Sequence, residues 1–280
     1  MSYFTLLGTG ACQGIPAPFC TCELCTYARK AMGKERRRRF SMIINGEVLV
    51  DFGPDTMNAL RDYCIDEMKI KHLCVSHSHS DHFQPLDLLW RAKMPTLPLD
   101  FISNCAVKKS YDTLYQIENA KYGNDVNDCV TWIEAVPGKE IVVGNYRILP
   151  VHATHMLGRE CAINYMITAP DGKKILVLCD TGWWEDESFN FVKGAMADAA
   201  VIELACGINP GEALKRHYHL GSEAALEFIA KLKSENSLKA DAKCVTAHIS
   251  HVPQITQSGY EEYFAGLEIS AGYDGMTVEY

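Results

Sequence analysis

The 280-residue sequence has no run that approaches the roughly 18 apolar residues of a membrane span. It also lacks internal repeats, low-complexity tracts and Ser/Gly linkers, and its start, MSYFTLLGTG, lacks the basic region and apolar core of a signal peptide. Positive charge is scarce: the chain has 27 basic and 35 acidic residues, which gives a net charge of -8. We therefore expect one domain over residues 1–280, in the cytoplasm, with no membrane partner and little attraction for nucleic acid.

Hydrophobic residues make up 48% of the chain, which is enough to bury a large core. Runs rich in β-branched and aromatic residues predict strands, and apolar residues at helical spacing predict helices. The strands are expected at 3–8, 41–45, 47–51, 71–76, 132–136, 140–143, 146–151, 161–168, 174–180, 198–204, 243–248 and 276–280. The helices are expected at 55–65, 86–92, 106–121, 186–196, 222–234 and 256–265. This order predicts an α/β fold in which two mixed sheets pack face to face between outer helices, an α/β/β/α four-layer sandwich.

The twelve cysteines divide into two kinds. Nine occur singly, several of them inside apolar stretches such as HLCVS and ILVLCD, and we expect these nine to be reduced thiols in the core. The other three, Cys20, Cys22 and Cys25, lie together in FCTCELC. Three thiolates at this spacing leave a tetrahedral zinc site one ligand short.

The stretch LCVSHSHSDHF carries the clearest chemical pattern in the chain. A predicted buried strand leads directly into His77, His79, Asp81 and His82. In an extended chain, residues i and i+2 point to the same side, so His77 and His79 can reach one metal ion, while Asp81 and His82 can reach a second. Imidazole beside carboxylate is the donor set of catalytic zinc-type sites.

HSHSDH resembles the H-x-H-x-D-H signature of the metallo-β-lactamase superfamily, whose fold is the sandwich predicted above. The resemblance implies a hydrolase with two divalent ions, manganese or zinc, and a hydroxide that bridges them. It also implies further ligands at later strand ends, where Asp180, His155 and His248 match, with His152 as the alternative register for His155.

The resemblance extends to the first strands. LLGTG resembles the opening of the RNase Z-like and phosphodiesterase branches, and Gly8 and Gly10 would permit a tight turn near the metals. VLVDFGPD resembles the family's strand that ends in an aspartate. This implies that Asp51 holds a ligand histidine in the correct tautomer.

The segment FCTCELC indicates which branch of the superfamily the chain resembles. Its cysteine spacing is similar to that of the PhnP-type phosphodiesterases, which carry a structural zinc on three such cysteines and a distant histidine. In that pattern the histidine lies three residues after the last catalytic ligand. The resemblance implies that His251 is the fourth ligand of one structural zinc, in a small insertion near 16–26. A disulfide or free surface thiols are the alternative, which a reducing cytosol disfavours. PqqB-like proteins share a similar insertion.

Four consecutive arginines, Arg36 to Arg39, precede the predicted strand 41–45. They lack interleaved aromatic residues in an acidic chain, so we expect a solvated face. The PhnP resemblance implies that one of the four contacts a substrate phosphate, without indicating which.

His219 and Asp81 are the candidate catalytic residues. His219 precedes the helix expected at 222–234, and its place resembles that of the proton-donating histidine of PhnP-like and RNase Z-like enzymes. His217 is the rival. An unperturbed imidazole titrates near pH 6.5, so it can carry and release a proton at neutral pH.

The resemblance implies a dinuclear phosphodiesterase acting on a small cyclic or diester phosphate, similar to phosphoribosyl cyclic phosphate. The alternatives are an RNase Z-like tRNA-processing nuclease, a mono-iron dioxygenase of the same fold, and a PqqB-like non-catalytic carrier. The acidic balance and the cysteine cluster argue against the nuclease, and the full ligand set argues against the carrier. Substrate choice is expected to lie in loops near 91–130 and 156–160. The oligomeric state stays open, with a homodimer as one option.

Overall fold

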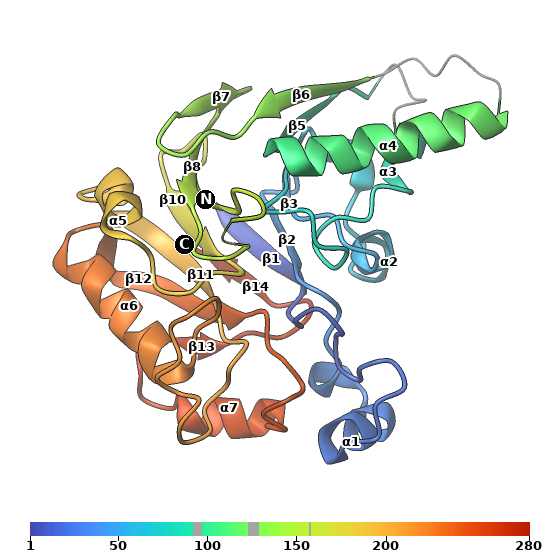
Figure 1. Cartoon of the computed structure of the whole chain (residues 1–280). Helices are drawn as coiled ribbons and strands as arrows, with labels where there is room; N and C mark the ends of the chain where they lie inside the picture. Colours follow the sequence, from blue (N-terminus) through green and yellow to red (C-terminus); the bar gives the residue numbers. More distant parts are fainter. Residues whose placement is uncertain (92–96, 123–128, 157) are drawn as a thin grey trace.

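The computed structural model describes residues 1–91, 97–122, 129–156 and 158–280. In this part of the chain, two seven-stranded sheets pack face to face with helices on both outer faces (Figure 1). The first sheet, in spatial order, consists of β14 (Thr277–Glu279), β1 (Tyr3–Gly8), β2 (Ser41–Ile44), β3 (Val48–Val50), β4 (His72–Cys74), β5 (Leu99–Ser103) and β6 (Val130–Glu134). The second consists of β13 (Ser270–Ala271), β12 (Leu238–Ala247), β11 (Ala197–Glu203), β10 (Lys174–Leu178), β9 (Ile163–Thr168), β8 (Tyr146–His152) and β7 (Ile141–Val143).

Strand directions follow the same plan in both sheets. Pairing is antiparallel from β14 to β3 and parallel from β3 to β6. It is antiparallel from β7 to β10 and parallel from β10 to β13. Because parallel strands end on the same edge of a sheet, the residues that follow β10, β11 and β12 emerge together.

Burial explains the four layers. The central core lies between the sheets and takes inward-facing residues from both, among them Phe4 and Met42 from the first sheet and Ile163 and Val177 from the second. A second cluster lies between the first sheet and α2 (Thr56–Asp62), α3 (Leu88–Arg91) and α4 (Cys105–Tyr122). A third lies between the second sheet and α5 (Asp186–Val192), α6 (Ser222–Ser234) and α7 (Gln257–Tyr263). A short 3-10 helix, η2 (Glu67–Lys69), leads into β4.

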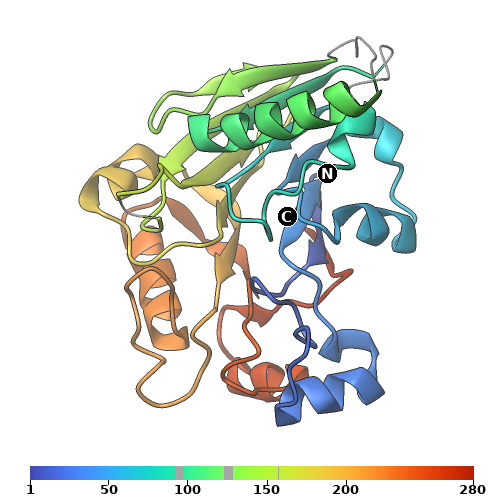
Figure 2. The same cartoon turned by 45° about the vertical axis from the view of Figure 1, so that its right-hand side comes forward.

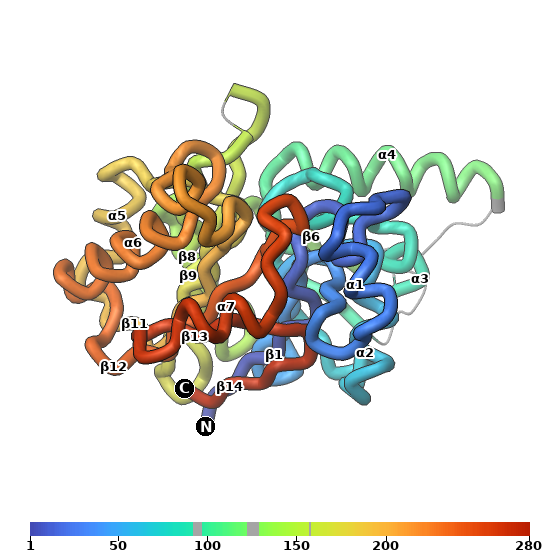
Figure 3. Tube along the Cα trace, turned by 90° about the horizontal axis from the view of Figure 1, so that it is seen from below, coloured from blue at the N-terminus to red at the C-terminus, as the bar shows by residue number. Residues whose placement is uncertain are grey.

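An excursion between β1 and β2 contains α1 (Glu23–Ala31) and the 3-10 helix η1 (Gly33–Glu35). Figure 2 shows α1 beside α7, although more than 200 residues separate them along the chain. An ion pair of 3.2 Å between Lys34 and Glu261 joins the two regions. The two chain ends also lie side by side (Figure 3), because β1 pairs with β14.

The predicted fold class is confirmed, and helix α6 has the predicted bounds of 222–234. Besides the two 3-10 helices, three of the described α-helices and strands were not predicted: α1, β5 and β13. The apolar residues of α1 do recur at helical spacing, but the helix is short and begins inside the FCTCELC cluster. β5 follows a proline-rich stretch, and β13 has only two residues.

The prediction of nine core thiols is wrong in part, since only Cys74, Cys179 and Cys244 of the nine are buried. The other six lie in loops, except for Cys105, which is the first residue of α4, and at these positions local hydrophobicity does not report depth. Positions 92–96, 123–128 and 157 of the expected substrate loops lie outside the described residues. Among the described helices, none is long and apolar enough to cross a bilayer.

Candidate metal centre and active site

The candidate ligands meet at the carboxyl ends of strands from both sheets. HSHSDH follows β4, and His248 comes directly after β12. Asp180 lies two residues beyond the end of β10. His155 lies three residues beyond β8. Each strand is fixed by its ladder, so the rigid sheets bring residues from four distant parts of the sequence to one place.

Asp180 lies between two groups of side chains. In the first group, its Oδ2 is 3.3 Å from His77 Nε2 and 3.5 Å from His155 Nε2. His79 completes this group, with Nδ1 2.9 Å from His77 Nε2. One ligand atom from each of these four residues lies within 4.8 Å of the others.

The second group contains His82, Asp81 and His248. His82 Nε2 is 3.2 Å from Asp180 Oδ2 and 3.1 Å from Asp81 Oδ2. His248 Nε2 is 2.8 Å from Asp180 Oδ1 and 3.8 Å from Asp81 Oδ2. Asp180 therefore presents oxygen atoms to both groups, as a carboxylate shared by two cations must.

The hydrogen bonding of these groups tests whether they suit metal ions. Several buried atoms of these two groups lie close to one another without a hydrogen bond of good geometry: His82 Nε2, His155 Nε2, Asp180 Oδ1 and both ring nitrogens of His248. Each buried polar atom left in this state costs about 1–3 kcal/mol, so their concentration at one place needs a compensating ligand. Imidazole nitrogen and carboxylate oxygen are donors that zinc and manganese accept, so the residues fit divalent metal ions.

Three residues that follow the strand ends and whose side chains lie in the site have an unfavourable backbone conformation. Asp51, Asp180 and His248 all have positive φ, at 61°, 45° and 51°. This left-handed conformation is uncommon for residues other than glycine and persists only where the surroundings enforce it. Gly53 shows how close the packing is, since a Cβ there would lie 2.0 Å from the carbonyl oxygen of Asp81.

Outer contacts orient the histidines. Asp51, which is fully buried, places Oδ2 2.7 Å from His82 Nδ1, and so directs His82 Nε2 toward Asp180. Ser76 Oγ lies 3.0 Å from both Asp51 Oδ2 and His77 Nδ1. The position of Asp51 is therefore the one expected for a residue that sets the tautomer of a ligand.

A carboxylate not anticipated from the sequence, Glu203, lies behind the second group. It is 1% exposed, ends β11, and accepts a 2.8 Å hydrogen bond from the backbone N–H of Thr181. His219 Nδ1 lies 3.0 Å from Glu203 Oε2, which leaves Nε2 for the cavity. The signal that could have identified Glu203 is the one used for Asp180, an acidic residue at the end of an apolar strand.

The charges of this network move several pKa values. The charge of Glu203 raises the pKa of His219. Burial lowers the pKa of His155 to about 4. For His248, burial favours the neutral ring, but Asp180 overcomes it and raises the pKa to about 10. Burial alone would raise the pKa of Asp81, yet the neighbouring imidazoles of His248 and His82 hold it well below its usual range.

A cavity of about 550 Å³ opens onto these groups. Its floor includes His79, Asp81, His155, Asp180, His219 and His248. Its walls come from segments 11–13, 205–215 and 250–253. Cys12 lies in one wall, and burial together with the charges of Asp81 and Asp180 raises the pKa of its thiol.

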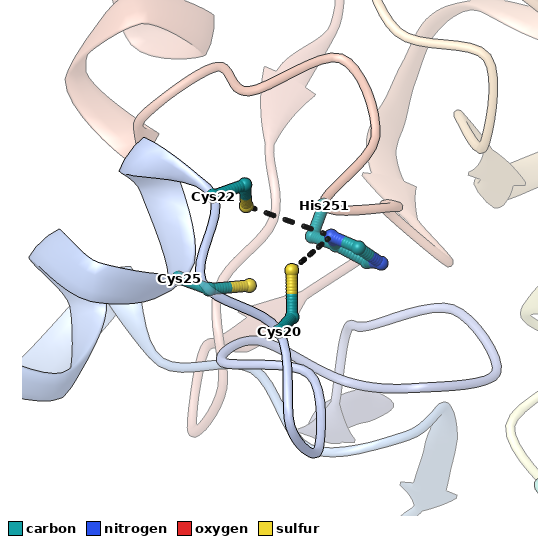
Figure 4. A group of neighbouring side chains, drawn as sticks. All are labelled: Cys20, Cys22, Cys25 and His251. Atoms are coloured by element: carbon teal, nitrogen blue, oxygen red, sulfur yellow. Dashed lines mark hydrogen bonds between the residues drawn. The ribbon is translucent and has the colours of Figure 1, made fainter.

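The three clustered cysteines converge on His251 in Figure 4. His251 Nδ1 is 3.7 Å from the Sγ of Cys20 and 3.8 Å from that of Cys22, and all four ligand atoms lie within 4.8 Å of one another. Burial raises the pKa of Cys25 to about 11, whereas hydrogen bonds from Cys22 lower that of Cys20. Three sulfur atoms and one imidazole form a donor set that fits a tetrahedral zinc ion.

The arginine run is not the solvated face that the sequence predicted. Arg37 is 4% exposed and donates to Thr9 Oγ1 at 2.7 Å and to the carbonyl of Gly272 at 2.8 Å. The other three guanidinium groups also contact protein: Arg36 donates to backbone carbonyls near the end of α1, Arg38 to Tyr63 and Asp62, and Arg39 to Asp55. Contacts with α1, with the region of α2, and with α7 and the segment after β13 account for this, and local charge does not reveal them.

The structure brings together all twelve candidate metal-ligating and catalytic residues in two places: eight of them lie in and around the two groups that share Asp180, and Cys20, Cys22, Cys25 and His251 form the separate thiol cluster. For the open alternatives, it places His155 rather than His152 beside Asp180, and His219 rather than the exposed His217 beside Glu203.

Two facing mixed sheets with histidines and aspartates gathered at their strand ends define a metallo-β-lactamase fold. The chain belongs to the beta-lactamase superfamily, because the model of the beta-lactamase superfamily domain matches residues 47–246. No curated protein sequence matches the chain.

Solved structures agree with this fold along the whole chain. A diphosphatase from the PhnP family has a TM-score of 0.74 at 21% identity, with 100% of this chain and 98% of that chain covered. Zinc-bound PqqB from Methylobacterium extorquens has a TM-score of 0.73 at 16% identity, covering 99% and 100%. The short form of human tRNase Z has a TM-score of 0.66 at 18% identity, covering 99% and 98%.

Proposed function

We propose that this protein is a metal-dependent phosphodiesterase that hydrolyses a small cyclic or diester phosphate, such as a phosphoribosyl cyclic phosphate. The observation that carries the proposal is Asp180, whose carboxylate contacts both groups of histidines at the floor of an open cavity, with Oδ2 against both groups and Oδ1 against His248. The cavity of about 550 Å³ has the volume of a small-molecule site, and the net charge of -8 favours a small substrate over a nucleic acid.

His77, His79 and His155 would hold one divalent ion and Asp81, His82 and His248 a second, with Asp180 shared. Manganese and zinc both suit these donors. When bound, such a pair neutralises phosphoryl oxygens and lowers the pKa of water from about 15.7 toward about 7.

The chain's own residues supply the proton that the departing oxygen needs. Glu203 holds His219 through Nδ1 and favours its protonated form, so Nε2 can donate a proton into the cavity. Asp81 also faces the cavity, and its low pKa keeps it ionised near the phosphate-binding floor, where it can hold a cation.

Cys20, Cys22, Cys25 and His251 would hold one structural zinc outside the cavity floor. We propose that the insertion at 16–26 is part of a single catalytic domain that acts in the cytoplasm on a small phosphorylated substrate.

The test combines metal analysis with turnover. Protein reconstituted with zinc or manganese should hydrolyse bis(p-nitrophenyl) phosphate and a ribose cyclic phosphate, and Asp180→Asn should lose metal and activity together. Asp198→Asn is the matched control, because Asp198 is another buried strand aspartate but is paired with Lys173 and Lys239. Cleavage of a precursor tRNA without turnover of the small diesters would favour the nuclease, and a metal-loaded protein inactive on all three would favour a carrier.

A further inference from the structure

A strained turn lies directly before the candidate proton donor, and the metal ligands do not account for it. Tyr218 has a φ of 63°, and the backbone N–H of His219 donates to the carbonyl of His217 at 2.8 Å. A hydrogen bond between residues i and i+2 with positive φ at the middle residue is a γ-turn of the rare, strained kind. Such a conformation persists only where the surrounding structure enforces it, so other contacts must hold this turn in place.

The turn orients two groups of the site at once. The carbonyl of Tyr218 lies 3.3 Å from Nδ1 of His155, while Nε2 of the same ring faces Asp180. The next residue, His219, places Nδ1 3.0 Å from Oε2 of Glu203. A shift of the turn would therefore move the proton donor and a candidate metal ligand together.

The side chain of Arg216 ties this turn to the helix α6. Its guanidinium group lies over the ring of Trp183, 4.4 Å from the ring centroid, and also pairs with the carboxylate of Glu227 on α6. Trp183 is itself held, because its ring packs edge-on against Phe228 of α6 with 5.3 Å between centroids. The guanidinium group therefore has one contact with an aromatic face and one with a carboxylate, and both partners are fixed by the same helix.

The backbone of Arg216 is held by the same segment. Its carbonyl accepts a 2.7 Å hydrogen bond from the N–H of Trp183. Gly182 lies so close that a Cβ there would be 2.3 Å from this carbonyl oxygen and 2.8 Å from the backbone nitrogen of Tyr218. Asp180 lies two residues before Gly182, so these contacts join the turn directly to the segment that carries the shared carboxylate.

We propose that Arg216 is a positioning residue that holds this turn and so aims the ring of His219 into the cavity. It does so by stacking on Trp183 and pairing with Glu227. The inference rests on the proposed phosphodiesterase function, in which His219 protonates the departing oxygen. Arg216 is not among the described residues that line the cavity, so this role involves no contact with substrate. Its effect should therefore appear in proton donation rather than in substrate binding.

Arg216→Gln tests this role, because it removes the charge and the planar group at a position where the side chain is 39% exposed and the fold does not depend on it. At saturating metal we expect kcat to fall roughly 10- to 100-fold for a diester with an alkoxide leaving group, since a displaced proton donor loses much of its effect. The loss should be far smaller for p-nitrophenolate, which departs without a proton. KM should change little for both substrates.

Two further variants separate positioning from the loss of a surface charge. Arg216→Lys keeps the charge that Glu227 and the ring of Trp183 attract but loses the planar guanidinium, so it should recover part of the lost kcat. Arg147→Gln is the matched control, because Arg147 also forms an exposed pair with a glutamate, Glu140, at 2.6 Å, and lies on β8 outside the cavity lining. This control should keep the wild-type kcat for both leaving groups.

Hydrogen–deuterium exchange of the metal-loaded protein separates a failure of this inference from a failure of the proposed function. The backbone amides of residues 216–221 should exchange faster in Arg216→Gln than in the wild-type protein, even if no diester is hydrolysed, and Arg147→Gln should leave them unchanged. Unchanged exchange in Arg216→Gln, or equal losses of kcat for the two leaving groups, would overturn the positioning role. Faster exchange in a protein whose wild type hydrolyses no diester would support the fixed turn and reject the phosphodiesterase instead.

Discussion

At the scale of single residues, Asp180 is the position on which the site depends. It is 3% exposed, adopts a left-handed backbone conformation, and contacts four histidines within 3.5 Å. Burying a carboxylate is unfavourable unless charge or hydrogen bonding compensates it. Burial favours the neutral rings of His248 and His82, but the charge of Asp180 overcomes this and raises the pKa of both.

His219 offers a direct test of proton donation. His219→Ala should retain the metals but lose roughly 10²- to 10⁴-fold in turnover of substrates with alkoxide leaving groups. The loss should be smaller for p-nitrophenolate, which departs without a proton. Steady-state kinetics on the two substrate types, with metal analysis of the variant, would measure this. Equal losses on both types, or loss of metal, would reject His219 as the acid.

Arg37 tests the burial of the arginine run. Arg37→Ala should lower the free energy of unfolding by about 3 kcal/mol, because it removes charged hydrogen bonds from a buried cluster with Thr9, Gly272 and Gln257. Denaturant titration measures the change. Arg61→Ala is the comparison, since Arg61 is 64% exposed and its substitution should stay within about 0.5 kcal/mol of wild type. Similar values for the two variants would contradict the structure.

At the scale of elements, the segment after β12 joins the two candidate metal sites. His248 faces Asp180, while His251, three residues later, faces the thiol cluster. Ile249 binds the first sheet's excursion through hydrogen bonds from its N–H to Thr9 and from Ala11 to its carbonyl. The thiol cluster therefore fastens α1 to the segment that forms a wall of the cavity.

Cys22→Ala tests this fastening. We expect it to lower zinc content by one ion per chain and to reduce thermal stability, since a structural zinc contributes its binding energy to folding. The chemistry of protein that remains folded should change far less. Cys105→Ala serves as a control, because Cys105 is exposed and outside the cluster. Wild-type zinc content and melting temperature in Cys22→Ala would show that the cluster is no zinc site.

At the scale of the whole molecule, the two sheets act as rigid halves that are joined across the central core and at the site. The first sheet supplies Asp51 and the HSHSDH residues, and the second supplies His155, Asp180, Glu203 and His248. Metal ions coordinated by both sets would link the sheets at the carboxyl ends of their strands.

Metal removal should therefore affect the stability of the entire chain. We expect elemental analysis to find three ions per chain, two at the strand ends and one at the cysteines. For each site at which the free metal stood a thousandfold above its Kd, a chelator should lower the melting temperature by roughly 8 to 16 °C. Calorimetry before and after chelation measures the shift. Active protein with a single ion per chain would contradict the dinuclear arrangement.

The sequence by itself determined the features that depend on near neighbours. HSHSDH follows a buried strand, and the spacing of two residues brings His77 and His79 together, although β4 itself ends at Cys74. The apolar spacing of residues 222–234 sets the bounds of α6. The alternation of strands and helices likewise sufficed for the four-layer class. A resemblance in the residues themselves, rather than any spacing, carried Asp180, His248 and His251.

Only the tertiary structure decided the features that depend on distant contacts. It selected His155 over His152, placed Glu203 against His219, and buried Arg37, which local charge had assigned to a solvated face. In each case the deciding partner lies at least 16 residues away along the chain. Periodicity reports which way a side chain points relative to its own element. What it meets there depends on the packing of one sheet against the other.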